Sequence, residues 1–92
     1  MMIELELMRK KIDEIDDKLL ALFKERLEVS KKIGLLKKEY KMAIFDPQRE
    51  KEIIDSYTQN ISEDEKKYIE KFLRNLMDIS KEVQSKWENL DF

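Results

Sequence analysis

The 92-residue sequence contains no cysteine and no histidine, and it has only one glycine and one proline. Without cysteine, the chain has no disulfide framework, no thiolate nucleophile and no cysteine-ligated metal. Without histidine, it lacks the commonest general base and the commonest metal ligand. A single glycine leaves no glycine-rich loop of the phosphate-binding kind. Any catalysis must therefore proceed without most of the usual catalytic side chains.

The chain also lacks a large excess of charge of either sign, because 19 lysines and arginines nearly balance 21 aspartates and glutamates, for a net charge of −2. A general nucleic-acid binder would have a basic excess. Charged residues begin at Glu4 and recur throughout. No apolar run therefore approaches the ~18 residues of a membrane span, and no secretory signal is visible. We expect a cytoplasmic protein that binds neither nucleic acid nor membrane.

Helix-forming residues dominate what is present. Ala, Glu, Lys, Leu and Arg make up 45 of the 92 residues, a share typical of long helices. Apolar residues recur at steps of three and four, which predicts one long helix from about Glu4 to Lys38. Gly34 lies inside this helix and costs roughly 1 kcal/mol relative to alanine. The stripe consists of Leu5, Met8, Ile12, Ile15, Leu19, Leu22, Val29, Ile33 and Leu36.

Two further helices have recognisable start signals. Asp46 followed by Pro47 reads as an N-cap with proline at the first helical position, and it predicts a short helix to about Thr58. Residues 62–65 (SEDE) form a capping box that starts a third helix. Residues 39–45 are expected to be a connection. The predicted fold is all-α, a single domain over residues 1–92 with helices in the order long, short, long.

The length of the first helix predicts self-association. Such a helix is ~50 Å long, whereas a compact chain of this size has a radius of gyration near ~12 Å. The helix therefore extends beyond its own domain, and its apolar stripe needs cover. We predict an intertwined homodimer. The alternative is a monomeric helical hairpin with a kinked first helix.

Polar residues interrupt the apolar stripes at three places, and a fourth, Lys37, lies on the same side of its helix as one of them. Arg26 takes a stripe position in the first helix, and a buried arginine needs an anionic partner. Lys37 follows eleven residues later, close to three turns, so both cations point to similar sides. Ser80 and Gln84 share one face of the third helix. Polar interruptions can merely fix helix register. Taken together, however, these four favour a site for a small anion.

Arginine is used sparingly, with four copies against fifteen lysines. Arginine is needed where a planar fork must grip a carboxylate. We interpret Arg74 as a solvated surface charge. Arg9 lies ~25 Å from Arg26 along one helix and cannot reach the same small ligand within one chain. In an antiparallel pair of long helices, Arg9 of the partner subunit could, which would make the site composite between subunits.

Several segments together resemble the all-helical class of chorismate mutases, in the short single-domain form. The resemblance covers nearly the whole chain, with its polar positions in the correct order on a three-helix pattern. It rests on residues 8–16 (MRKKIDEID), 18–20 (KLL), 25–26 (ER), Lys37, 46–50 (DPQRE) and 80–84 (SKEVQ).

The resemblance implies an isomerase that converts chorismate to prephenate by an intramolecular Claisen-type rearrangement, in phenylalanine and tyrosine biosynthesis on the shikimate pathway. It implies a homodimer that binds a dicarboxylate substrate and needs no cofactor or metal. It also implies that Arg26 and Arg9 of the partner subunit hold the two substrate carboxylates, with Ser80 assisting at the ring carboxylate.

The remaining roles also come from the resemblance. Lys37 and Gln84 are expected to bond the ether oxygen of the breaking bond, and Lys37 also meets the enolpyruvyl carboxylate. Glu50 is expected to take the ring hydroxyl, helped by the backbone near Asp46. Arg49 belongs to the same charged surroundings.

Two other functions stay open. An isochorismate pyruvate-lyase shares the fold and the cationic residues, but enzymes of that kind tend to lack the acidic pair found here at Asp46 and Glu50. A non-catalytic helical dimerisation module would fit the charge content and the heptad-like spacing. It would leave Arg26, Ser80 and Gln84 in the apolar stripes unexplained. The chorismate rearrangement itself needs no nucleophile or proton relay, which suits a chain without cysteine or histidine.

Overall fold

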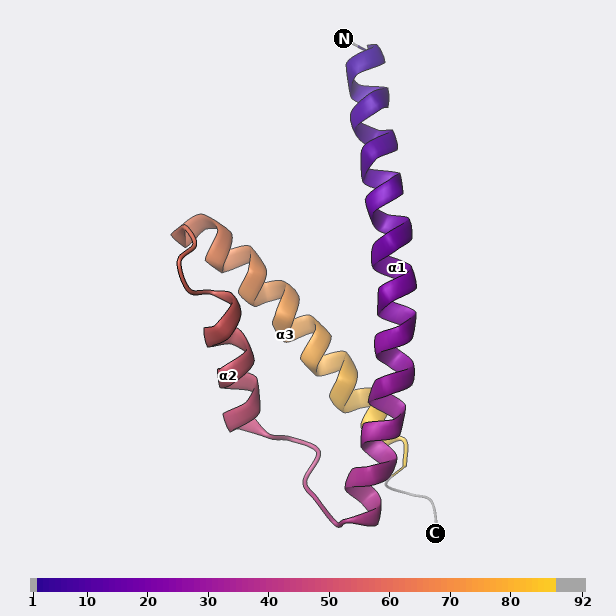
Figure 1. Ribbon diagram of the computed structural model, residues 1–92, viewed down its shortest axis with the longest axis vertical. Coiled ribbons are helices and arrows are strands. Elements are labelled where there is room, and N and C mark those ends of the chain that lie inside the picture. The colour runs from indigo at the N-terminus through magenta and orange to yellow at the C-terminus, as the bar shows by residue number, and fades with distance from the viewer. Residues whose placement is uncertain (1, 88–92) are drawn as a thin grey trace.

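The computed structural model describes residues 2–87, which form three helices and no strand (Figure 1). Helix α1 spans Met2–Glu39, α2 spans Pro47–Tyr57 and α3 spans Glu63–Ser85. The all-α class and the long–short–long order are confirmed. Residue 1 and residues 88–92 of the predicted domain lie outside the described part.

The predicted caps begin α2 and α3. The Asp46 carboxylate accepts a hydrogen bond from the backbone N–H of Arg49 at 3.1 Å, and Pro47 takes the first helical position. The Ser62 hydroxyl accepts from the backbone N–H of Glu65 at 3.2 Å. Each bond satisfies a backbone donor that the first helical turn leaves free. Local sequence therefore determines where both helices begin.

Helix α1 ends in a cap formed by Lys41, whose backbone is left-handed with φ 54°. The Met42 N–H bonds to the Lys37 carbonyl at 2.7 Å, and the Lys41 N–H bonds to the Lys38 carbonyl at 3.2 Å. This pair of bonds is a Schellman motif, which usually places glycine at the left-handed position. The chain turns sharply here and enters the 40–46 connection to α2.

The helices pack as an open arrangement. Helix α3 packs on α1 and α2 packs on α3, while α1 and α2 make no close backbone approach. The N-terminal half of α1 stands clear of both other helices (Figure 1). The chain measures 58 × 28 × 14 Å with a radius of gyration of 17.3 Å, against about 12 Å for a compact chain of this length. The predicted overshoot of the first helix is confirmed.

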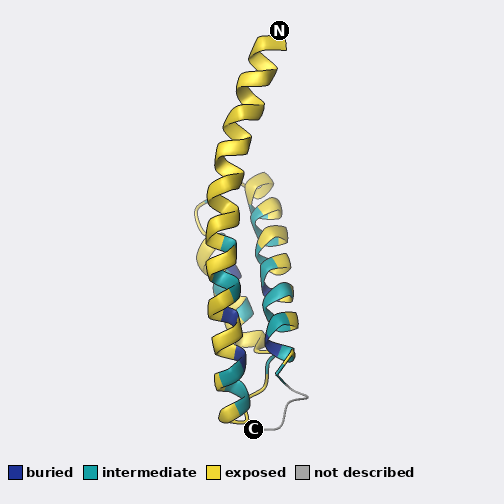
Figure 2. Cartoon of the chain, turned by 90° about the vertical axis from the view of Figure 1, so that its right-hand side faces the viewer, coloured by how far each residue is buried: buried dark blue, intermediate teal, exposed yellow. Residues whose placement is uncertain are grey.

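The projecting half of α1 is exposed on every side (Figure 2). Its apolar stripe includes Leu5, Ile12 and Leu22, which are 44%, 55% and 63% exposed. Among the described residues, only two hydrophobic residues are buried, Ile54 and Met77, and neither is fully enclosed. The single chain therefore has a small core and a long unburied apolar surface.

The one glycine lies where α1 and α3 come closest. A Cβ atom at Gly34 would lie 2.7 Å from the Cα of Gln84 and 2.8 Å from Cδ1 of Trp87. The Trp87 indole N–H also donates to the Lys31 carbonyl at 2.9 Å across the same crossing. Gly34 thus costs helix propensity but allows the close helix contact from which Gln84 extends.

Candidate active site

A cavity of about 380 Å³ lies between the C-terminal half of α1, the start of α2 and the C-terminal half of α3. Its charged lining has four cations and two carboxylates, a net charge of +2. Such a lining attracts a small anion, because an excess of positive charge in a concave wall raises the local electrostatic potential. The lining consists of Arg26, Val29, Ser30, Ile33, Lys37, Ile44, Asp46, Arg49, Glu50, Ile53, Met77, Ser80, Lys81 and Gln84.

Arg26 is held against α3 by neutral oxygens. Its Nη1 donates to the Leu76 carbonyl at 3.1 Å and to the Ser80 hydroxyl, while the Ser30 and Ser80 hydroxyls lie 3.0 Å apart. The expected anionic partner is not found among residues 2–87, and the nitrogens Nη2 and Nε have no acceptor there. The guanidinium is therefore fixed in position with donors to spare for a carboxylate.

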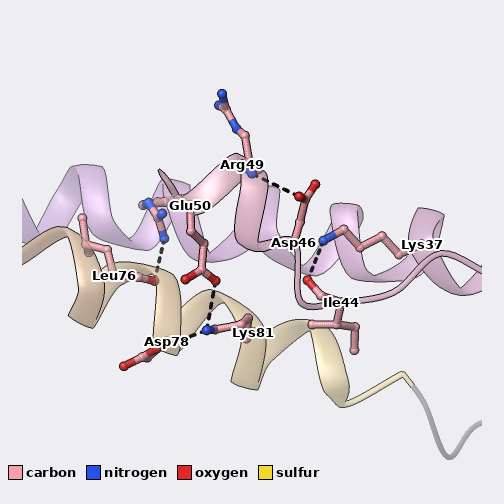
Figure 3. Close-up of polar contacts among 9 residues, drawn as sticks. Lys37, Ile44, Asp46, Arg49, Glu50, Leu76, Asp78 and Lys81 are labelled. Atoms are coloured by element: carbon pink, nitrogen blue, oxygen red, sulfur yellow. Dashed lines mark hydrogen bonds and ion pairs between the residues drawn. The ribbon is translucent and has the colours of Figure 1, made fainter. Parts of the chain in front are cut away.

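Lys37 links α1 to the connection that follows it. Its ammonium donates to the Ile44 carbonyl at 2.9 Å (Figure 3). One carbonyl uses one of the three ammonium protons, and the side chain is half-buried. The cation therefore lies in the cavity wall with donors left for a ligand.

Glu50 and Lys81 form the best-shielded ion pair in the described chain. The Lys81 ammonium lies 2.9 Å from Glu50 Oε2, 3.3 Å from Asp78 Oδ1 and 4.7 Å above the Phe45 ring centre. The hydrogen bond to the Glu50 carboxylate is the main reason that the pKa of Lys81 rises above its usual value, and loss of hydration opposes that rise. Lys81 therefore stays charged well beyond neutral pH.

Asp46 and Arg49 enter the cavity wall at the first turn of α2. One oxygen of Asp46 is occupied by the cap on the Arg49 N–H. The Arg49 side chain is exposed and extends away from Lys37 and Glu50 (Figure 3). In this conformation Arg49 contributes its backbone end to the cavity and leaves its guanidinium in solvent.

Gln84 is the polar group with an unmet hydrogen bond. The residue is only 7% exposed, and its Oε1 has no partner among the described residues. An amide carries two donors and one acceptor, and rotation about its last bond exchanges the two ends. Buried polar atoms without partners are rare, so the amide is suited to bond a molecule in the cavity.

The structure brings together seven of the eight residues predicted for the site. All of them line the one cavity: Arg26, Lys37, Asp46, Arg49, Glu50, Ser80 and Gln84. The eighth, Arg9, lies on the projecting half of α1, far along the helix from the cavity. Within one chain it takes no part in the site.

Two polar lining residues were not predicted, Ser30 and Lys81. Ser30 is four residues from Arg26, so its position on the same helix face was a readable signal. Lys81 is one of fifteen lysines, and nothing local distinguishes it from a solvated one. Only the contact between α2 and α3 reveals its role.

Metal and membrane features can be checked over the described range. Residues 2–87 contain no cluster of three carboxylates close enough to hold a metal ion. Over the same residues, no helix has the length and apolar content needed to cross a bilayer.

Comparison with known proteins gives a family. The family model for chorismate mutase type II matches residues 8–85. A bifunctional chorismate mutase/prephenate dehydratase from Aquifex aeolicus is 43% identical over 52 residues, which cover 56% of this chain and 14% of that protein. A chorismate mutase from Methanocaldococcus jannaschii is 49% identical over 47 residues, which cover 51% of this chain and 48% of that protein. The chain thus spans less than half the length of these curated relatives.

A solved structure has the same fold. A conserved hypothetical protein from Pyrococcus furiosus has a TM-score of 0.72 and 34% sequence identity, and the match covers 87% of this chain and 93% of that one. The family match covers α1 from residue 8 onward, the whole of α2 and α3, and every residue that lines the cavity. The chain belongs to the chorismate mutase type II family.

Proposed function

We propose that this chain is an isomerase that rearranges chorismate to prephenate. The observation that carries the proposal is the shared cavity, which is lined by Arg26 and Lys37 from α1 and by Gln84 from α3. The substrate is a dicarboxylate, and the cavity lining carries a net charge of +2. Family membership gives the reaction class, and the charge of the cavity fits the substrate.

The reaction leaves two tasks to the protein. The flexible enolpyruvyl arm must be held over the ring in its reactive shape, which removes much of the entropic barrier. Negative charge that builds on the ether oxygen must be stabilised as the C–O bond lengthens. Neither task uses a nucleophile or a proton relay. Fixed donors in a cavity, which this chain has, are sufficient for both.

We assign the carboxylate grips to Arg26 and Ser80. Arg26 is held by Leu76 and Ser80 with its remaining donors unused, so it can bind a carboxylate without reorganising. Ser80 lies between Arg26 and Ser30 and can add a hydroxyl donor at the same place. A preorganised fork is favoured for this purpose, since little side-chain entropy is lost on binding.

We assign the ether oxygen to Lys37 and Gln84. Lys37 supplies a full positive charge, and Gln84, which is 7% exposed, supplies a neutral donor through the N–H group of its amide. Donors of this kind act most strongly where water is excluded. The Glu50 carboxylate, together with the backbone near Asp46, would accept the ring hydroxyl. Arg49 would add its charge from the rim.

The second carboxylate would be held by Arg9 of the partner subunit in a homodimer. Support comes from the unburied stripe on α1, which continues into an apolar groove of about 350 Å³ between α1 and α3. A second copy of α1, running antiparallel, would cover the stripe and bring its Arg9 near the cavity. The groove is lined by Leu19, Leu20, Leu22, Phe23, Arg26, Phe72, Asn75, Leu76 and Ile79.

Localisation and partners follow from the same proposal. A biosynthetic isomerase of this kind would act in the cytoplasm. It would bind its small substrate and its own second copy, and neither nucleic acid nor membrane.

The direct test is addition of purified protein to chorismate and, separately, to isochorismate. A fall in chorismate absorbance with formation of prephenate is expected. Release of pyruvate from isochorismate alone would instead favour the lyase, a reading that the presence of Asp46 and Glu50 at the cavity disfavours. No change in either substrate would favour a non-catalytic dimerisation module.

A further inference from the structure

Lys81 lies in the cavity wall, yet none of the roles above uses it. It follows Ser80 on α3, and its ammonium touches three different parts of the chain. It bonds Glu50 on α2, contacts the Phe45 ring on the connection, and pairs with Asp78 on its own helix. The Lys81 side chain therefore links α3 to α2 and to the connection before α2, and Figure 3 shows its contacts with Glu50 and Asp78.

Glu50 depends on that contact for its orientation. Its side chain is 18% exposed, and Lys81 is the one partner that its carboxylate has among the described residues. The bond occupies Oε2 and leaves Oε1 without a donor. A free carboxylate on a helix samples several rotamers, so the ion pair removes that freedom before a ligand arrives.

The charge of Lys81 is already matched by its neighbours. Two carboxylates, those of Glu50 and Asp78, lie within 3.3 Å of the ammonium. A cation so paired is poorly suited to stabilise new charge on a substrate, whereas the one hydrogen bond of the Lys37 ammonium within residues 2–87 is to the neutral Ile44 carbonyl. Of the two lysines in the cavity wall, Lys37 therefore has its charge available for a substrate, whereas the charge of Lys81 is used within the protein.

We infer that Lys81 is a positioning residue that holds Glu50 so that its Oε1 accepts the ring hydroxyl of the substrate. This inference rests on the proposed function. The hydroxyl contact exists both before and during the rearrangement, so Lys81 acts on substrate binding rather than on the bond-breaking step. Losing such a contact raises KM and leaves kcat nearly unchanged.

Steady-state kinetics of four variants tests the inference. Lys81→Met is expected to raise KM on the order of tenfold, with kcat within about twofold of wild type. Lys81→Arg keeps the charge and the ring contact, and it should restore KM to within about threefold. In a Glu50→Gln background, Lys81→Met should change kcat/KM by less than about twofold, because its target is already altered.

The matched control is Lys51→Met. Lys51 lies next to Glu50 on α2 and pairs with Asp55 at 3.5 Å, but both side chains are well exposed, at 74% and 58%. Its loss should leave both constants at wild-type values, since exposed pairs contribute little. Circular dichroism melts of each variant show whether a kinetic loss comes from misfolding or from a misplaced Glu50 carboxylate. If Lys81→Met does not fold, Lys81→Gln replaces it.

Each outcome has a distinct meaning. If wild-type protein does not convert chorismate, the proposed function is wrong and this inference falls with it. If wild type is active but Lys81→Met lowers kcat with KM unchanged, Lys81 stabilises the transition state directly and the inference alone is wrong. The inference would also be wrong if Lys81→Met lowered kcat/KM equally in the wild-type and Glu50→Gln backgrounds, or if it did not lower kcat/KM at all.

Discussion

At the scale of single residues, the site consists of polar side chains placed where helix periodicity calls for apolar ones. Arg26, Ser80 and Gln84 could be found from the sequence because helical spacing makes such interruptions visible. The hydrogen bonds that hold these residues could not be predicted in the same way. Arg26 is held by the Leu76 backbone carbonyl and by Ser80 rather than by an acidic residue, and a backbone partner leaves no trace in sequence.

Replacing Lys37 tests charge stabilisation at the ether oxygen. Lys37→Ala should lower kcat by the equivalent of about 3–4 kcal/mol, the usual cost of losing one such donor. KM should change far less, because the charge develops only in the transition state. Single-substrate kinetics measures both. Lys32→Ala, on the exposed side of α1, is the control, and a variant of Lys37 that raised only KM would contradict the assignment.

The amide of Gln84 predicts a pH profile. A neutral amide donates at any pH, so the rate should stay steady between about pH 6 and 8. In Gln84→Glu, a carboxyl group donates only when protonated, so the rate should fall as pH rises and recover in acid. Rates of wild type and of Gln84→Glu, measured between about pH 6 and 8, test whether the side chain at position 84 donates to the substrate. A flat profile for the variant would show that residue 84 does not donate to the substrate.

At the scale of helices, local signals predicted the boundaries well and the contacts poorly. Asp46, Pro47 and Ser62 gave the starts of α2 and α3, because capping is chemistry between near neighbours in the chain. From the sequence, Gly34 could be seen only as a residue that lowers helix propensity. The structure explains the glycine by a close contact with Gln84, fifty residues away, which the local sequence pattern does not encode.

Filling the Gly34 position should loosen the crossing of α1 and α3. In Gly34→Ala, the added Cβ would lie 2.7 Å from the Gln84 Cα, so the helices must separate. Overpacking typically costs about 1–3 kcal/mol and outweighs the ~1 kcal/mol gained in helix propensity. We expect a lower free energy of unfolding by denaturant, together with a lower kcat because Gln84 shifts. Lys24→Ala, at an exposed position on α1, should do neither.

Relieving the Lys41 cap should have the opposite effect. Its φ of 54° places a lysine in a conformation that favours glycine. Lys41→Gly should therefore raise the free energy of unfolding by up to about 1 kcal/mol. The control is Lys51→Gly, which places glycine inside the regular helix α2 and should lower the free energy of unfolding by about 1 kcal/mol. In denaturant melts, the two variants should therefore shift the free energy of unfolding in opposite directions. A loss at both positions would contradict the cap.

At the scale of the whole molecule, α1 extends well beyond the part of the chain in which the three helices pack together. The length and the all-α class were predictable because they follow from periodicity along one helix. The position of α3 across α1, and the open shape that results, depend on packing between distant segments. A homodimer should elute from gel filtration at about twice the 11.2 kDa mass of the chain. Ile12→Glu, in the middle of the exposed stripe, should shift elution toward the monomer.

The scarcity of buried side chains has a thermodynamic consequence. A body with so few enclosed apolar groups, among them Ile54 and Met77, gains little free energy by folding alone. If the stripe of α1 finds its cover on a second copy, folding and association become a single equilibrium, and mass action governs the melting midpoint. Calorimetry at serial dilutions should then record a midpoint that falls with each step, whereas a self-sufficient monomer would melt at one temperature throughout.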